Sequence, residues 1–178
     1  MVAGAGGGSN SSFTIAGNQL LSNIVFNYEF VSSCSIRVQT NDGNGGVFEK
    51  IFVITVNNMN DVPYSIVLSN SSVNENVSLS SLVGNLSALD GDVGDVHTYT
   101  LVAGAGSANN ASFTISGNQL LTATALNFEV KSSYSIRIQT NDGNGGTYQK
   151  AFSIAVNDVN EAPLYHDAAV SIVENLSN

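Results

Sequence analysis

Apolar and polar residues alternate with the period of a β-strand through most of the chain. Along residues 133–140, Tyr134, Ile136 and Ile138 would face a core while the residues between them would face solvent. The run 147–157 shows the same alternation. Because the helical period is missing, the pattern predicts an all-β protein.

One complete set of strands is readable in the second half of the chain. The predicted strands are 64–76, 80–89, 97–103, 112–116, 118–123, 133–140 and 147–157. Short strands of this number, separated by turn-forming residues, predict a Greek-key β-sandwich with an immunoglobulin-like topology. Because the predicted number of strands, seven, is odd, the chain enters each sandwich at one pole and leaves at the other. Successive units are therefore expected to stack end to end as a rod.

The chain is a tandem array of near-identical copies. Residues 2–63 and 102–163 have nearly the same sequence with some substitutions, and Val2-Ala-Gly-Ala-Gly, for example, recurs from Val102 onward. The spacing has the length of a whole domain rather than of a solenoid turn. We expect an N-terminally truncated repeat at 1–61 (the first repeat), a complete repeat at 62–161 (the second repeat), and a linker with the first strand of a third repeat at 162–178.

Composition narrows the partners that the chain can have. The formal net charge is −9 with only five basic residues, which disfavours binding to nucleic acid or to anionic membranes. No stretch approaches the roughly 20 apolar residues that span a bilayer, so no membrane insertion of this segment is expected. The single cysteine, Cys34, corresponds to Tyr134 in the other copy, which predicts an apolar strand position and no disulfide.

Acidic residues gather at the two poles of the predicted sandwich. Asp90, Asp92 and Asp142 fall in loops at the N-terminal pole of the second repeat. Glu75 and Glu129 fall at the C-terminal pole, together with the acidic linker that follows. Each pole therefore collects several negative charges.

End-to-end stacking would concentrate these charges further. It would bring Glu29 and the linker residue Asp61 against Asp90, Asp92 and Asp142, so that five carboxylates converge. Such repulsion requires cations to neutralise it. Oxygen ligands in flexible loops, without His or Cys, favour Ca²⁺ over zinc or a transition metal, and Mg²⁺ suits a crowd of protein oxygens less well.

Five motifs then resemble the calcium motifs of cadherin repeats, in the order in which that family has them. They are Asn74-Glu75-Asn76, Asp90-Gly-Asp92, Leu126-Asn-Phe-Glu129, Thr140-Asn-Asp142-Gly and Asp158-Val-Asn-Glu-Ala-Pro163. The resemblance covers essentially the whole chain and implies calcium ions between consecutive repeats, a rod stiffened by calcium, and adhesion at the cell surface. The richness in Gly, Asn and Ser and the near-identical copies resemble, more specifically, the cadherin-like repeats of large bacterial surface proteins.

The resemblance also implies a set of ligands. At the junction of the two repeats they are Glu29, Asn60, Asp61, Asp90, Asp92 and Asp142, with backbone carbonyls near Met59 and Val62; at the C-terminal pole they are Glu75, Glu129, Asp158, Asn160 and Glu161. Asn27, Asn127 and Asn58 stand where an aspartate is expected, so the outermost ion should bind more weakly. Replacing Asp92 by alanine is expected to weaken binding more than replacing Asp95.

Functions other than adhesion are also possible for a chain of this kind. Catalysis is not expected, because the chain has no Gly-x-Ser-x-Gly elbow, neither His97 nor His166 is duplicated, and Asp90 and Asp92 share one loop instead of flanking a cleft. Neither histidine is expected to bind metal. The main prediction is a calcium-dependent extracellular, cell-surface module whose partners are neighbouring repeats of the chain and a homophilic or other surface protein. A structural spacer and a non-catalytic region of a secreted hydrolase are the alternatives.

The truncated first repeat leaves one further question open. It is expected to begin inside its third strand and to lack its first two, which exposes sheet edges that can pair with another chain. Donor-strand exchange with residues 164–178 of another molecule is one alternative.

Overall fold

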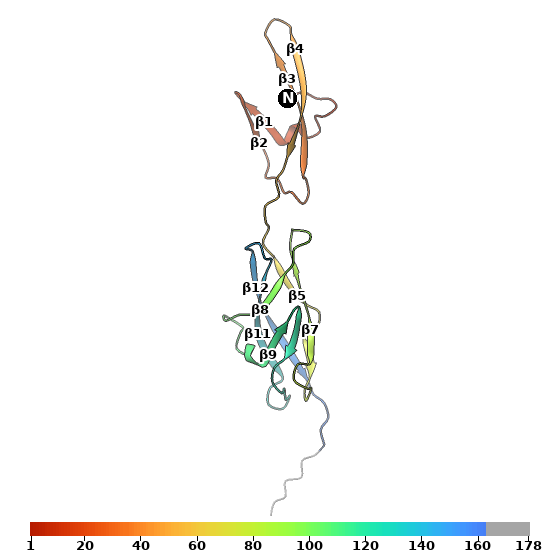
Figure 1. Cartoon of the computed structure of the whole chain (residues 1–178), viewed down its shortest axis with the longest axis vertical. Coiled ribbons are helices and arrows are strands. Elements are labelled where there is room, and N and C mark those ends of the chain that lie inside the picture. The colour runs from red at the N-terminus through yellow and green to blue at the C-terminus, as the bar shows by residue number, and fades with distance from the viewer. Residues whose placement is uncertain (163–178) are drawn as a thin grey trace, which may run out of the picture. The chain divides into compact units, whose positions relative to one another are not determined.

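The computed structural model describes residues 1–162, so the third-repeat strand predicted beyond them lies outside the described residues. The described chain is built of β-strands (Figure 1), with two short 3₁₀ turns, η1 (Asn10–Ser12) and η2 (Asn110–Ser112). No helix in residues 1–162 has the length and apolar character needed to cross a bilayer. The all-β prediction is confirmed.

Contacts divide the chain into two compact units. The first comprises Met1–Val67, Leu86–Thr100 and Ile138–Lys150, and the second comprises Leu68–Asn85, Leu101–Arg137 and the described residues from Ala151 onward. These units do not follow the sequence repeats, so the repeat boundaries remain a prediction. Each of the two candidate sites below lies inside one unit.

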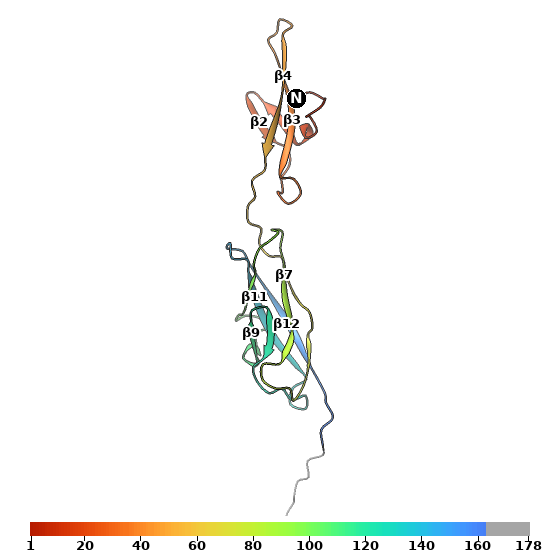
Figure 2. The same cartoon turned by 45° about the vertical axis from the view of Figure 1, so that its right-hand side comes forward.

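The first repeat consists of two β-hairpins, which Figure 2 shows from a second side. Strands β1 (Phe13–Ala16) and β2 (Gln19–Ser22) form one antiparallel pair, and β3 (Ser33–Asn41) and β4 (Val47–Thr55) form the other. The β1–β2 turn places Gly17 at φ 62°, a conformation that glycine adopts without steric cost.

The second repeat contains two four-stranded sheets, as expected of a sandwich. The strands are β5 (Ser65–Leu68), β6 (Ser72–Asn74), β7 (Leu82–Leu89), β8 (Thr98–Leu101), β9 (Phe113–Ser116), β10 (Gln119–Thr122), β11 (Ser133–Asn141) and β12 (Thr147–Asn157). One sheet has the order β5-β7-β10-β9 and the other has the order β6-β12-β11-β8.

The predicted first strand, 64–76, is divided into β5 and β6, which belong to different sheets. β6 pairs in parallel with β12, whereas β5 pairs with β7. The break lies at Asn70, whose side-chain amide donates to the carbonyls of Ser72 at 2.6 Å and Val83 at 2.7 Å. Because Asn side chains satisfy nearby backbone groups, they compete with a continuous ladder. The repeat therefore has eight strands where the sequence pattern showed seven runs.

The alternation of side chains along the long strands is confirmed. Tyr134, Ile136 and Ile138 of β11 are at most 9% exposed, and Ile154 and Val156 of β12 are also buried. Burial of one face of each strand supplies the main favourable term for the sandwich.

The first repeat keeps its small core by a pair of compensating changes. Cys34 is 4% exposed in β3, which confirms that it fills an apolar strand position. It is smaller than its counterpart Tyr134, and the neighbouring Phe26 is larger than its counterpart Leu126. The ring of Phe26 packs on Phe13 with centroids 5.3 Å apart. Volume lost at one position is thus restored at another.

Candidate metal centre

Three carboxylates meet in the first compact unit. One oxygen each of Asp90, Asp95 and Asp142 lies within 4.8 Å of the other two. We call this group the first cluster. Asp90 and Asp95 belong to the loop after β7, and Asp142 begins the tight loop between β11 and β12.

Asp142 is buried but held in its charged form. Its Oδ1 accepts the backbone N–H groups of Asn144 at 2.8 Å and Gly146 at 2.9 Å, and its Oδ2 accepts the amide of Asn60 at 3.0 Å. The Asn60 amide is the largest influence that lowers the pKa of Asp142, and with the backbone donors it outweighs burial, which raises it. A carboxylate that is only 2% exposed therefore stays negative.

Asp90 is held by two groups of its own loop. Its Oδ1 accepts the N–H of Asp92 at 3.2 Å, and its Oδ2 lies 2.9 Å from Nε2 of His97. The side chain of Asp90 is 4% exposed and that of His97 12% exposed. The ring of His97 is thus directed toward this aspartate.

The linker before Pro63 is bonded to the same loop. The N–H of Asp61 donates to Oδ2 of Asp92 at 2.7 Å, and the Asn58 amide donates to Oδ1 of Asp92 at 3.1 Å. The Asp61 carboxylate packs so closely on Gly91 that a Cβ there would lie 2.4 Å from its Oδ2. Both carboxylate oxygens of Asp92 therefore accept hydrogen bonds from the linker.

Asp95 is the residue of the first cluster that the sequence analysis did not include. Both of its oxygens accept the Asn144 amide, at 3.3 and 3.2 Å. Together with Asn58, Asn60 and Asp92 these residues line a polar hollow of about 280 Å³. Asp95 is the third acidic residue of the Asp-Gly-Asp-Val-Gly-Asp run, whereas the family motif ends at Asp92.

A second cluster lies in the second compact unit. Oxygens of Glu75, Glu129 and Asp158 lie within 4.8 Å of one another. Glu75 is 2% exposed, and its two oxygens accept the N–H groups of Phe128 at 2.7 Å and Val159 at 2.8 Å. These two bonds, the Phe128 bond first, lower the pKa of Glu75 against the opposing effect of burial. Glu75 therefore fastens the loop after β10 to the linker after β12.

Glu129 shows the opposite behaviour. A bond from its own backbone lowers its pKa, but partial burial and the negative charges of Glu161, Glu75 and Asp158 outweigh that bond, so the net pKa is raised. Glu129, Asp158, Asn160 and Glu161 line an open hollow of about 610 Å³. The raised pKa thus reflects the like charges that surround Glu129.

The structure brings together most of the predicted ligands. Asp90 and Asp142 join the first cluster, Asn60 bonds to it, Asp61 and Asp92 bond to each other beside it, Glu75, Glu129 and Asp158 form the second cluster, and Asn160 and Glu161 border the second. Glu29 is exposed and belongs to neither cluster among the described residues. Its role as a ligand remains a prediction.

Asn27 and Asn127 have a structural use of their own. The side-chain oxygen of Asn127 accepts the N–H of Val130 at 2.8 Å, and that of Asn27 accepts the N–H of Phe30 at 3.1 Å. Each asparagine closes the turn that carries Glu129 or its counterpart in the first repeat. An aspartate at either position could accept the same N–H bond, so asparagine there keeps the turn without adding a negative charge.

Comparison with known proteins adds the fold family. No protein-family model matches the chain, and no curated protein matches its sequence. The protocadherin γB4 extracellular domain aligns with 22% identity over 83% of this chain and 24% of its own, with a TM-score of 0.61. Protocadherin γB2 extracellular cadherin domains 3–6 align with 17% identity over 90% and 40%, with a TM-score of 0.65. The chain has a cadherin-like fold.

A third solved structure aligns over most of both chains. Human protocadherin-24 EC1-2 aligns with 18% identity over 86% of this chain and 80% of its own, with a TM-score of 0.69. By contrast, the chain spans less than half of each of the two structures above. The first two neighbours are described as extracellular domains of protocadherins, and the likeness bears on the fold alone. The narrower resemblance to bacterial surface repeats stays a prediction.

Proposed function

We propose that the chain is a calcium-dependent interaction module of an extracellular protein, in which Ca²⁺ neutralises the two carboxylate clusters and restrains the linkers beside them. The observation that carries the proposal is the convergence of three carboxylate oxygens within 4.8 Å at two separate places. In each cluster one member, Asp142 or Glu75, is buried and yet stabilised in its charged form. Three carboxylates this close to one another repel each other, and a bound cation would remove that repulsion.

The geometry suits calcium. Calcium–oxygen distances are about 2.3–2.6 Å, so two ligands of one ion lie at most about 5.2 Å apart. Oxygens within 4.8 Å of one another can therefore share an ion after small side-chain movements. Both clusters consist of carboxylates, which suit Ca²⁺ rather than soft metals, and the loops can supply the further oxygens that its high coordination number needs. We expect dissociation constants of roughly 10 µM to 1 mM, as for extracellular calcium modules.

The linker is where calcium would act mechanically. Asn60 bonds to Asp142, and Asp61 bonds to Asp92 beside the cluster, so an ion bound by Asp90, Asp95 and Asp142 would add to bonds that already restrain this segment. A restrained linker fixes the direction in which one repeat continues into the next. The partners are therefore neighbouring repeats of the same chain, and a homophilic or other cell-surface protein for adhesion.

A spacer is the second candidate function. The near-identity of residues 2–63 and 102–163 favours it, because stacking surfaces need not diversify whereas recognition surfaces usually do. Aggregation of beads coated with the chain distinguishes the two. Clustering that depends on calcium supports adhesion, and dispersed beads in calcium support the spacer.

The calcium site is tested by titration calorimetry of the whole chain and by its thermal midpoint in calcium and in EDTA. Asp142→Asn should abolish binding at the first cluster. Asp42→Asn is the matched control, because Asp42 accepts the same two loop N–H bonds, from Asn44 and Gly46, but belongs to neither cluster. An absence of calcium heat together with equal midpoints in calcium and EDTA would refute the proposal.

A further inference from the structure

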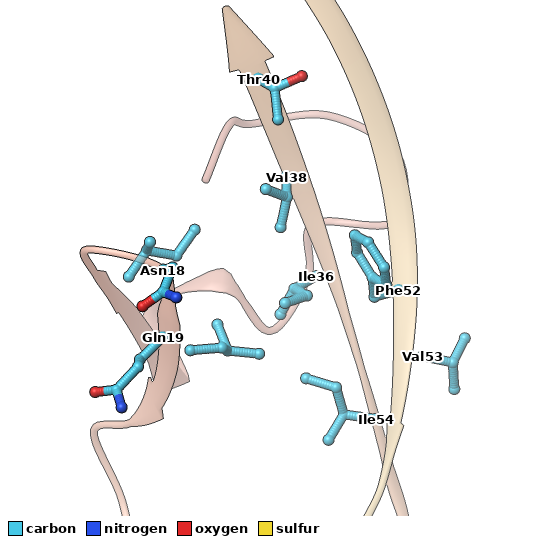
Figure 3. Close-up of a pocket in the computed structure, with 10 residues that line it drawn as sticks. Asn18, Gln19, Ile36, Val38, Thr40, Phe52, Val53 and Ile54 are labelled. Atoms are coloured by element: carbon cyan, nitrogen blue, oxygen red, sulfur yellow. The ribbon is translucent and has the colours of Figure 1, made fainter.

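The outward face of β4 in the first repeat carries exposed aliphatic side chains. Val47, Ile51 and Val53 lie on the same face of the strand and are 59%, 48% and 71% exposed. Figure 3 shows Val53 on the opposite side of the β4 ribbon from Phe52 and Ile54, which are directed toward the interior of the repeat. We call Val47, Ile51 and Val53 the apolar stripe.

The position of the stripe in the sheet explains its exposure. The corresponding residues of β12, namely Thr147, Ala151 and Ser153, are exposed as well, although the second repeat has both of its four-stranded sheets. This face of the strand is therefore open to solvent in a repeat whose sheets are complete. What distinguishes the first repeat is chemistry, because three branched aliphatic side chains replace two hydroxyl groups and a methyl group. Single exposed aliphatic residues are ordinary, whereas several on one face are typical of a contact surface.

The charges beside the stripe balance each other. Among the outward positions of β3 and β4 the only charged residues are Arg37 and Glu49. Nε of Arg37 donates to Oε2 of Glu49 at 2.9 Å, and the Gln39 amide donates to Oε1 of Glu49 at 3.0 Å. The whole chain has a net charge of −9 and repels a second copy over most of its surface. On this face that repulsion is absent.

We propose that the apolar stripe is the contact surface for a second copy of this chain, in a dimer that packs two β3–β4 hairpins face to face. A two-fold dimer needs a surface that is complementary to itself. Val47 and Val53 lie at opposite ends of the stripe, so antiparallel β4 strands would bring Val47 of one copy opposite Val53 of the other. The same arrangement brings Arg37 of each copy within reach of Glu49 of the other, which favours this orientation.

The balance of charges favours a second copy over a partner of another kind. A strongly acidic or basic partner would meet a like charge at Glu49 or Arg37, whereas a second copy offers one charge of each sign together with the aliphatic groups. Three aliphatic side chains from each copy make a small interface, so we expect a weak and reversible dimer. The inference rests on the proposed role as an interaction module, for which it names the homophilic surface, but it does not depend on calcium.

The test is sedimentation velocity of the whole chain in EDTA over a series of concentrations. We expect a monomer–dimer equilibrium. A triple variant, Val47→Thr with Ile51→Ala and Val53→Ser, installs the residues that the second repeat carries at these positions, so it should remain folded. It should weaken dimerisation roughly tenfold or more, because both copies lose apolar contact surface. Circular dichroism checks the fold of each variant.

Two single substitutions form a matched pair. Val53→Asp and Ser153→Asp place a carboxylate at the same outward position of the two repeats. Val53→Asp should weaken the dimer at least as much as the triple variant, because an unpaired charge would enter an apolar interface. Ser153→Asp should leave dimerisation unchanged.

Three results would overturn the proposal: a monomer at every concentration up to about 1 mM, a dimer that persists in the triple variant, or equal weakening by Val53→Asp and Ser153→Asp. Calcium titration of the same chain keeps the two proposals apart. A chain that dimerises without binding calcium contradicts the calcium site alone, and a chain that binds calcium but stays monomeric contradicts the dimer alone.

Discussion

Asp95→Asn and Asp92→Asn form a pair of substitutions that separates ion binding from linker binding. Both residues lie in one loop, three positions apart, and both changes remove one negative charge while keeping the size of the side chain. Asp95 contributes an oxygen to the first cluster, whereas Asp92 accepts the N–H of Asp61 and the amide of Asn58. The geometry therefore reverses the expectation from the family motif, which places the larger loss at Asp92.

The expected loss of calcium affinity in Asp95→Asn follows from the loss of one ligand of the first cluster. Asp95 is one of three carboxylates whose oxygens lie within 4.8 Å. Loss of a group that only hydrogen-bonds to a metal ligand weakens metal binding by about 10- to 100-fold. Loss of a direct ligand should cost at least as much, ~1.4–2.8 kcal/mol of binding free energy. Asp92→Asn keeps one carbonyl oxygen as an acceptor, and we expect a change in calcium affinity of less than about threefold, within the scatter of single polar substitutions.

The assay is calcium titration calorimetry, combined with amide hydrogen exchange at Asp61. Asp95→Asn should lower the affinity and leave exchange of the Asp61 amide in EDTA unchanged. Asp92→Asn should leave the calcium affinity nearly unchanged and speed exchange of the Asp61 amide, because that amide loses a charged acceptor at 2.7 Å. If Asp92→Asn costs more calcium affinity than Asp95→Asn, the ligand assignment made from the structure is wrong and the motif-based assignment is right.

Three further substitutions test other parts of the argument. Glu129→Gln should raise the thermal midpoint in EDTA at pH 7 and lower it in calcium. Because the pKa of Glu129 is raised in the folded state, the folded protein loses stability as the pH rises through the carboxylate range, so the gain in EDTA should vanish near pH 4. A gain in both conditions would argue against an ion at the second cluster. Gly91→Ala should weaken calcium binding if the Asp61 carboxylate is a further ligand, as the family motif implies, because the new methyl group would push that carboxylate away from the loop. The backbone of Gly91 is not in the left-handed region, so the repeat should stay folded. Unchanged calcium affinity would mean that Asp61 is not a ligand. Leu120→Ala should cost about 2–5 kcal/mol of unfolding free energy in urea and Leu20→Ala less than about 1.5 kcal/mol, since the first side chain is 0% and the second 42% exposed; equal losses would mean that Leu20 is covered in solution.

The sequence predicted the long strands well because their alternation is local information. Apolar residues recur at every second position over 134–138 of β11 and 152–156 of β12, and these positions are less exposed than their neighbours. The break between β5 and β6 was not predicted, since it depends on Asn70 reaching the carbonyl of Val83 on a strand thirteen residues later. A contact of this kind has no signature in the hydrophobic pattern.

Some residues of the candidate site were likewise predictable from the sequence and others were not. Glu75, Glu129 and Asp158 were predicted because each sits in a motif at a loop or linker, and motif order carries over through a shared fold. Asp95 was missed, and the orientation of Asp92 was not foreseen, because both depend on which way a flexible acidic loop folds around Asp90. Sequence reasoning finds the loops that supply carboxylates; which carboxylates converge is decided by hydrogen bonds across the loop.

The duplication offers one more physical argument, because it supplies a comparison at constant sequence. Asp42 and Asp142 occupy the same turn and accept the same two backbone N–H bonds, and the pKa of each is lowered. Only Asp142 also accepts Asn60 and has two carboxylates within 4.8 Å. The turn motif alone therefore produces an ionised aspartate and no cluster. Under the proposed function, binding of a metal ion at this turn depends on the carboxylates of the loop after β7. The number of sites in such an array should therefore follow the number of junctions between repeats and not the number of Asn-Asp-Gly motifs.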